Sequence, residues 1–294
     1  MESMFSEASA FNGDISGWDV KSVANMEGMF SRASSFNMDI GDWDMSNVTT
    51  METMFYNAIV FNQSISGWNV SKVTNMKSLF REASTFNVDI SSWDVSNVLD
   101  MESMFSRAFA FNMNVSDWNV AKVANMGYMF SEASAFNGNI SGWDVKNVAD
   151  MSNMFSSAIV FNQNIGSWDV SNVLNMKSMF FRAHGFNMNI SNWNVTKVAN
   201  MGYMFSEASA FNGNISGWDV KNVADMRNMF SRASSFNMDI GSWDVSNVLD
   251  MEFLFFRAFV LNMNISDWNM AKVTNMRYLF SKLVLSMETS VVGM

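Results

Sequence analysis

Tryptophan occupies every twenty-fifth position along this chain, from Trp18 and Trp43 to Trp268, and none of the eleven copies leaves that register. A fixed period of this length is typical of a solenoid, in which each unit forms one coil and stacks on the next. The sequence therefore predicts one elongated domain of about eleven coils over residues 1–280. Residues 281–294 leave the register, and we expect this tail, which includes Leu283-Val284-Leu285, to cap the last coil.

The composition supplies a core and excludes several classes of protein. Apolar residues make up 49% of the 294, and there is no cysteine to form a disulfide. The net charge of −10 is spread as single Asp and Glu residues, which disfavours a nucleic-acid groove. No apolar run reaches the roughly 18 residues of a membrane span, and the start lacks the regions of a signal peptide. Met1 begins in repeat register, so we expect an open first coil whose apolar residues need a partner.

The first part of each coil has the spacing of a helix. Met26, Met29, Phe30 and Ala33 fall at i, i+3, i+4 and i+7, which predicts a helix of about two turns, with Asn25 as its N-cap. Such a helix is too short to persist alone, so stacking must hold it. Counting both parts of the coil, we expect about nine inward side chains in each repeat.

The second part of the coil has the spacing of a strand. Trp43 and Met45 flank Asp44 with period two, which predicts a short strand with Asp44 pointing outward. Strands stack at about 4.8 Å, whereas helices need about 8–10 Å, so we expect an arc with the strands on its concave face. The outward strand column consists of Asp19, Asp44, Asn69, Asp94, Asn119, Asp144, Asp169, Asn194, Asp219, Asp244 and Asn269.

A second column is asparagine in every coil, from Asn12 and Asn37 to Asn262. Stacked side-chain amides can bond the turn backbone of their own coil and the next, which favours a structural role. The alternative is a row of ligand-binding groups.

The repeat itself resembles a known family. The string Trp-Asp-Val-Ser-Asn-Val-x-x-Met-x-x-Met-Phe-x-x-Ala-x-x-Phe-Asn, at Trp93 to Asn112, is similar to the short tandem repeat of bacterial surface lipoproteins. That family is related to BspA-like leucine-rich-repeat proteins and was long carried as a domain of unknown function. The resemblance runs from Met1 to about Phe280. It implies an α/β solenoid of right-handed, leucine-rich-repeat-like coils, with short parallel strands on one side and short helices on the other. It also implies an extracellular or surface-bound protein for adhesion or display, with no catalytic residues to carry over.

Few residues point to chemistry. His184 is the single histidine, and the chain has no cysteine. Because no second histidine or cysteine can share a metal with it or be activated by it, we expect His184 to be a surface residue rather than a metal ligand or a catalytic base. The column of Asp and Asn residues could hold calcium, but the Gly-Gly-x-Gly-x-Asp turns of calcium-wrapping repeats are missing. We therefore expect no catalytic site, no metal and no cofactor.

Asparagine glycosylation is a further possibility. Five of the nine sequons share one column, so either one accidental sequon was multiplied by repetition or a stripe of sugars runs along one edge. The candidate acceptors are Asn47, Asn62, Asn69, Asn114, Asn139, Asn189, Asn194, Asn214 and Asn264.

Two functions remain after an enzyme is disfavoured. The first is a structural protein that associates end to end into extracellular filaments or a surface layer. Its candidate contacts are Met1, Met4, Phe5, Phe253, Phe256, Phe259 and Tyr278. The second is an adhesion or ligand-binding module that uses the strand face, with glycans or a host surface protein as partner. Residues 121–150 and 196–225 are identical at 29 of 30 positions, so blocks of three repeats have been copied, either neutrally or to make a regular surface.

Overall fold

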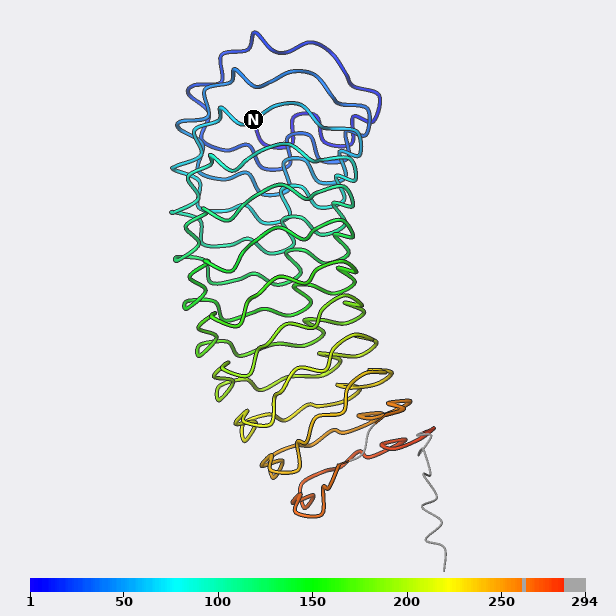
Figure 1. Ribbon diagram of the computed structural model, residues 1–294. Coiled ribbons are helices and arrows are strands. Elements are labelled where there is room, and N and C mark those ends of the chain that lie inside the picture. Colours follow the sequence, from blue (N-terminus) through cyan, green and yellow to red (C-terminus); the bar gives the residue numbers. More distant parts are fainter. Residues whose placement is uncertain (261–262, 283–294) are drawn as a thin grey trace, which may run out of the picture.

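The computed structural model describes residues 1–260 and 263–282, which wind into stacked coils, one for each repeat, along a curved rod (Figure 1). The predicted solenoid is confirmed. Of the predicted tail 281–294, Ser281 and Lys282 still follow the repeat, since Arg257 N donates to Ser281 O at 3.2 Å and Lys282 has the positive φ of its position. The residues from Leu283 onward lie outside the described residues, as does Asn262. We number coil positions from the repeat methionine, so Met1, Met26 and Met276 each occupy position 1 and the tryptophans occupy position 18.

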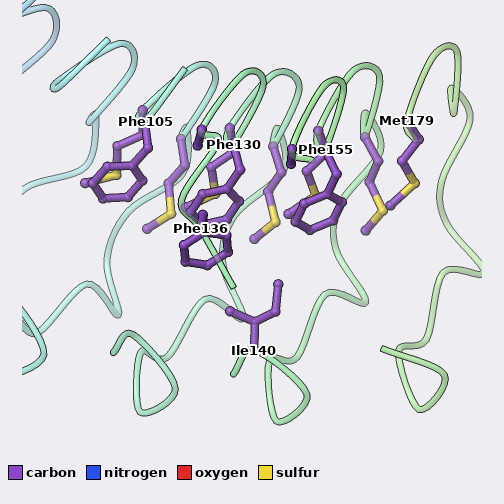
Figure 2. Close-up of a cluster of buried hydrophobic side chains, with 14 of the residues drawn as sticks. Phe105, Phe130, Phe136, Ile140, Phe155 and Met179 are labelled. Carbon is purple, nitrogen blue, oxygen red and sulfur yellow. The ribbon is translucent and has the colours of Figure 1, made fainter. Parts of the chain in front are cut away.

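One continuous core fills the stack. In the coil of residues 126–150 nine apolar side chains are buried, as the sequence predicts: Met126, Met129, Phe130, Ala133, Phe136, Ile140, Trp143, Val145 and Val148. Each ring lies against its counterparts in the adjacent coils, and the centroids of Phe105 and Phe130 are 5.6 Å apart (Figure 2). Every coil therefore depends on its neighbours to cover its apolar face.

The predicted helices are wrong. No residue of 1–260 or 263–282 is helical, and none of them forms a helix able to cross a membrane. Positions 1–8 instead form overlapping turns, in which the N–H groups of Met29 and Ala33 donate to the carbonyls three residues earlier. Alternate N–H groups leave the coil: that of Gly28 donates to Glu52 O at 2.8 Å and that of Phe30 to Met54 O at 2.9 Å. We call positions 1–8 the ladder segment.

Coil spacing explains why the helix does not form. Neighbouring coils lie about 6 Å apart at their aromatic rings, whereas packed helices need about 8–10 Å between axes. The inward pattern of Met26, Met29 and Phe30 is as predicted, since all three are fully buried. Their backbone conformation is not helical, because positions 3 and 7 have positive φ angles in every coil, as in Thr53 (52°) and Asn57 (53°).

The predicted strand at position 18–20 is also wrong. The only bridges in the described residues are isolated parallel ones at position 25, from Asn25↔Thr50 to Asp250↔Asn275. Trp43 and Met45 are nevertheless buried, and Asp44 is exposed, as expected. The indole N–H of Trp43 donates to Ile15 O of the preceding coil at 3.2 Å, so the tryptophan column is held by side-chain rather than strand hydrogen bonds.

The curvature has the opposite sense to that predicted. Ring centroids of adjacent coils are 5.6 Å apart at Phe30 and Phe55 in the ladder segment, but 6.5 Å apart at Trp143 and Trp168. The ladder segment therefore lies on the inner side of the arc and the tryptophan column on the outer side.

The asparagine column at position 12 has the predicted structural role. The side-chain oxygen of Asn12 accepts the backbone N–H of Asn37 at 2.9 Å, and Asn37 does the same for Asn62. This ladder continues through the stack to Asn237, whose N–H donates to Asn212. Each asparagine thus pairs a backbone donor that no regular sheet would cover.

Candidate interaction surfaces

The outward side chains of the ladder segment, at positions 2, 3, 6 and 7, form one surface that we call the ladder face. Three hollows follow one another along it and share their aromatic walls. The first, of about 260 Å³, lies between Arg81 and Tyr128. The second, of about 450 Å³, runs from Tyr128 to Phe181 and Tyr203, and the third, of about 320 Å³, runs from these two rings to Phe256. Together they make an interrupted groove along the axis of the solenoid.

Serines form the floor of this groove. Seven hollow-lining serines are buried: Ser103, Ser106, Ser131, Ser156, Ser178, Ser206 and Ser231. None of their hydroxyl groups forms a hydrogen bond to another described residue. Because these residues are small, the aromatic side chains project beyond them and separate one hollow from the next. The serine hydroxyls can donate hydrogen bonds to a ligand or accept them from it.

Most aromatic side chains of this face recur at intervals of three coils, and only Tyr56 and Phe253 fall outside that interval. Tyr128, Tyr203 and Tyr278 occupy position 3, and Phe181 and Phe256 occupy position 6. Tyr128 is 43% exposed. Phe181 and Tyr203 meet edge to face at 6.4 Å. These positions hold Ser or another small or polar residue in most other coils, so the rings are additions to a polar surface.

Charge is distributed unevenly along the ladder face. Its first half carries seven carboxylates and four cations: Glu2, Glu7, Glu27, Glu52, Glu82, Glu102 and Glu132 with Arg32, Lys77, Arg81 and Arg107. From residue 176 onward it carries seven cations and two carboxylates: Lys177, Arg182, Arg227, Arg232, Arg257, Arg277 and Lys282 with Glu207 and Glu252. A chain of net charge −10 thus presents a basic region at one end of its inner face.

Ion pairs between coils neutralise part of this charge. Glu207 accepts from Arg182 at 2.9 Å and from Arg232 at 3.3 Å, while Asp225 holds Arg227 at 2.7 Å. Arg257 lies over the ring of Phe256, 5.3 Å from its centroid, and forms no ion pair with another described residue. The basic region therefore keeps cations that no partner in the described chain neutralises.

The acidic half has a different electrostatic character. The hydrogen bond from Lys77 to Glu102, at 2.8 Å, raises the pKa of that lysine. Burial raises the pKa of Asp100, because the charged carboxylate is separated from water. Arg81 lies between the ring of Tyr56 and Glu82, and its Nε is buried with no hydrogen-bond partner. Arg81 also lines the first hollow.

The residues predicted for self-association fall into separate groups. Met4 is 53% exposed on the first coil, where Met1 and Phe5 are half-buried. Phe253, Phe256 and Tyr278 instead lie on the ladder face, where Phe253 stacks on Tyr278 at 4.7 Å. Phe259 is exposed at position 9, outside that face.

The ladder hydrogen bonds all point the same way, which makes the two ends of the described stack different. Every ladder N–H donates toward the following coil, as Ser3 N does to Glu27 O at 2.8 Å. Carbonyls of Glu2 and Met4 in the first coil, and N–H groups of Tyr278 and Phe280 in the last, have no backbone partner among the described residues. The described stack thus carries acceptors at one end and donors at the other.

The outward column at position 19 is exposed as predicted, although it belongs to turns rather than to a strand. Asp94 Oδ1 accepts the N–H of Ser96 at 3.0 Å, and Asn69 Oδ1 accepts that of Ser71 at 3.1 Å. No three acidic or histidine side chains of the described residues come together as a metal site. The calcium hypothesis therefore gains no support.

The nine sequon asparagines are all exposed. Five of them, at position 14, accept the N–H two residues later through Oδ1, as Asn114 does from Ser116 at 3.0 Å. Asn47, at position 22, donates its Nδ2 to Lys21 O at 2.9 Å, so one of the two hydrogens on this acceptor nitrogen is already engaged. Glycosylation stays a prediction.

His184 is exposed, with its ring 3.4 Å from the hydroxyl of Ser209.

Comparison with protein families places the repeat. The sequence matches the family described as Mycoplasma protein of unknown function, DUF285, over residues 1–87, 61–161, 134–234 and 185–289. The chain belongs to this family. The resemblance to short bacterial tandem repeats is thereby confirmed, while the BspA-like relationship stays a prediction. No curated protein matches the sequence.

Solved structures with a similar course of the chain are distant. A leucine-rich repeat protein from Eubacterium ventriosum is 12% identical over 83% of this chain and 64% of its own, with a TM-score of 0.40. A leucine-rich cell surface protein from Faecalibacterium prausnitzii is 10% identical, over 74% of this chain and 76% of its own, with a TM-score of 0.31. The TLR13–ssRNA13 complex is 11% identical over 85% of this chain, which spans only 38% of the TLR13 chain, with a TM-score of 0.34. At TM-scores below 0.5, these likenesses carry no argument about function.

Sequence reasoning missed most of the ladder face. It singled out Phe253, Phe256 and Tyr278 as unusual but not Tyr128, Phe181 and Tyr203 in the same two columns. The signal was available, because each of these rings replaces a small or polar residue in its column. It could be found only by comparing columns, since no local motif marks any of these positions.

Proposed function

We propose that this protein is a non-catalytic interaction protein of the cell surface, which holds an extended ligand along its ladder face. The observation that carries this proposal is the run of three hollows joined through Tyr128, Phe181 and Tyr203. Concave surfaces with exposed rings and a few convergent polar groups are where proteins commonly bind ligands. The resemblance to surface lipoproteins supports the location.

The proposal is tested by replacing rings with the residue that the chain itself uses at the same positions. A Phe181→Ser/Tyr203→Ser variant copies Ser156 and Ser178 of neighbouring coils, so we expect it to fold. Binding to the immobilised protein is measured by biolayer interferometry with three probes: polygalacturonate, cello-oligosaccharides and poly-glutamate. We expect at least one probe to bind the natural chain and to lose about tenfold in affinity with the variant, the loss expected for contacts of about 1.4 kcal/mol.

A matched control comes from position 24, just before the ladder segment of the following coil. Leu174 is 51% exposed outside the hollows, and Ala149 and Ala199 occupy its position in the adjacent coils. Leu174→Ala should bind each probe as the natural chain does. If no probe depends on the two rings, with circular dichroism showing the variant folded, the ladder face is not the binding surface and the proposal fails.

A second candidate function is end-to-end association into filaments or a surface layer. The one-way ladder favours it, because donors of Tyr278 and Phe280 match in register the acceptors of Glu2 and Met4 of another copy. Charge favours it too, since position 2 carries Glu2 at one end and Arg277 at the other, and position 7 carries Glu7 and Lys282. Glu7 would then lie between two cations, as Glu207 lies between Arg182 and Arg232.

Charge reversal tests this second function. We expect the natural chain to form rods longer than one molecule in negative-stain micrographs, and a Glu2→Lys/Glu7→Lys variant to stay monomeric in analytical ultracentrifugation. Mixing that variant with an Arg277→Glu/Lys282→Glu variant should restore association, because only unlike ends then meet with opposite charges. Short monodisperse rods at high concentration of the natural chain would exclude end-to-end association.

A further inference from the structure

We propose that the ligand of the ladder face is a linear acidic polysaccharide, lying along the solenoid with about one sugar ring for each coil. The inference rests on the proposed function and names the chemical class of its ligand. It is carried by four features of the face: its spacing, its hydroxyl floor, its recurring rings and the excess of cations from residue 176 onward.

Spacing separates a polysaccharide from an extended peptide. The buried phenylalanine rings beneath successive ladder segments are 5.6–5.9 Å apart, so the ladder face repeats once in each coil with room for one pyranose ring. An extended peptide repeats its side chains on one face every two residues, about 6.6 Å, and loses register within a few coils. A peptide also cannot join as an added strand, because the ladder N–H and carbonyl groups within the stack already bond to adjacent coils.

The polar groups of the groove suit a ligand rich in oxygen. The seven floor serines offer hydroxyls without partners in the described chain, one or two in nearly every coil from residue 103 to residue 231. At the head of the groove Arg81 lines the first hollow, and the distance of 3.7 Å from its Nε to Glu82 Oε1 is too long for a hydrogen bond. Sugar hydroxyls and carboxylates can pair with the serine hydroxyls and with the guanidinium group of Arg81.

The rings provide stacking platforms in a regular series. Tyr128 and Tyr203 are separated by three repeats, as are Phe181 and Phe256, so each kind of platform returns after three coils. The apolar face of a pyranose stacks on an aromatic ring, and with one sugar for each coil every third sugar would meet the same kind of ring. Copying a block of three repeats would therefore also copy a binding subsite.

The cations of the second half of the face, seven against two carboxylates from residue 176 onward, favour an acidic chain over a neutral one. Lys177 lines the second hollow together with Glu132, and Arg232 lines the third, where it pairs with Glu207. Arg257 and Lys282 lie over the ring of Phe256, at 5.3 and 6.0 Å from its centroid. Guanidinium groups beside stacked sugars are placed to pair with carboxylates or sulfates.

The experiment measures affinity and length dependence on the full chain by isothermal titration calorimetry. The probes are galacturonate oligosaccharides of three, six and nine rings, cello-oligosaccharides of the same lengths, and poly-glutamate. We expect the acidic sugars to bind, with affinity rising from three to nine rings and falling with added salt. Tyr203→Ser should weaken nine-ring binding about tenfold. Lys177→Ser, which copies Ser152, should reduce the preference for acidic over neutral sugars.

Leu174→Ala serves as the control and should change none of these values. The inference is overturned if acidic sugars bind no tighter than neutral ones, if affinity does not rise with length, or if Tyr203→Ser binds them unchanged. Binding of poly-glutamate alone, lost in Tyr203→Ser, would overturn the polysaccharide and leave the proposed function standing. Binding of no probe would overturn both.

Discussion

At the scale of single residues, outward carboxylates and amides fold this chain by bonding their own backbone. Asp44, Asp94 and Asp244 each accept the N–H of the serine two residues on, at 3.0 Å. The serine hydroxyl adds a second hydrogen bond, and the two together lower the pKa of each of these carboxyl groups. Asp and Asn interchange freely at this position because either side chain supplies the acceptor oxygen that the turn needs.

This arrangement predicts how stability depends on pH. A carboxyl whose pKa is lower in the folded chain stabilises the fold above its unfolded pKa, and the contribution disappears as pH falls through the folded pKa. Ser96→Ala removes the larger of the two causes at Asp94, so its pKa should rise toward the ordinary value while remaining below it. Carboxyl-carbon NMR titration measures this change, with Asp169 beside Ser171 as the internal reference that should not move.

Acid unfolding should follow the same sign. Below about pH 4 the natural chain should lose stability as these aspartates take up protons, and Ser96→Ala should lose less over that interval. An Asp94 pKa unchanged in Ser96→Ala would show that the hydroxyl is not the cause.

At the scale of one coil, the backbone follows from the close approach of its neighbours. The strained positive φ at positions 3 and 7 costs about 1–2 kcal/mol for a non-glycine residue, and yet only Gly28 among these positions is glycine. The conformation persists because it aims alternate N–H groups at the next coil, as in Arg107 N to Ser131 O at 2.8 Å. Tertiary hydrogen bonds thus override local preference.

Two glycines test how tightly coils meet outside the ladder segment. A β-carbon on Gly166 would overlap the carbonyl oxygen of Asn189 in the next coil, whereas one on Gly142 would meet nothing within 4 Å. Gly166→Ala should therefore destabilise the fold by about 1–3 kcal/mol through overpacking. Gly142→Ala should be neutral or stabilise by up to about 1 kcal/mol, since neither glycine has a positive φ. Urea unfolding measures both, and equal effects would contradict the close approach.

The same contrast explains which features could be predicted from the sequence. Burial was predictable because Met126, Met129 and Phe130 reveal an inward face whatever the backbone does. The spacing i, i+3, i+4 does not distinguish a helix from overlapping turns, so the helix was predicted wrongly. The choice between them depends on the distance to the next coil, which no single repeat encodes. The ladder-face groove was missed for a related reason: Tyr128 and Phe181 come together only once the coils are stacked.

At the scale of the whole molecule, each coil contacts only its neighbours, so stability is close to a sum over coils and their interfaces. Such an array tolerates loss of whole units if the new junction reproduces an old one. Residues 126–150 and 201–225 are identical, so removing residues 126–200 leaves the coil of 101–125 facing the sequence that it faces now. Block copying therefore changes the length of this protein without creating a new interface.

We expect the chain lacking residues 126–200 to fold and to unfold cooperatively, with a urea m-value lower by about a quarter because less surface is exposed. A deletion of nearly equal length that breaks register, residues 126–194, should fail, since it sets Trp against positions that hold polar residues in the next coil. Near-ultraviolet circular dichroism of the tryptophan stack separates the two outcomes. If both deletions fold equally well, the repeat register does not govern the stack. If neither folds, the coils are not independent units. If only the in-register deletion folds, the ladder face of this protein can lengthen or shorten only in steps of whole 25-residue repeats, which is the period of the tryptophans.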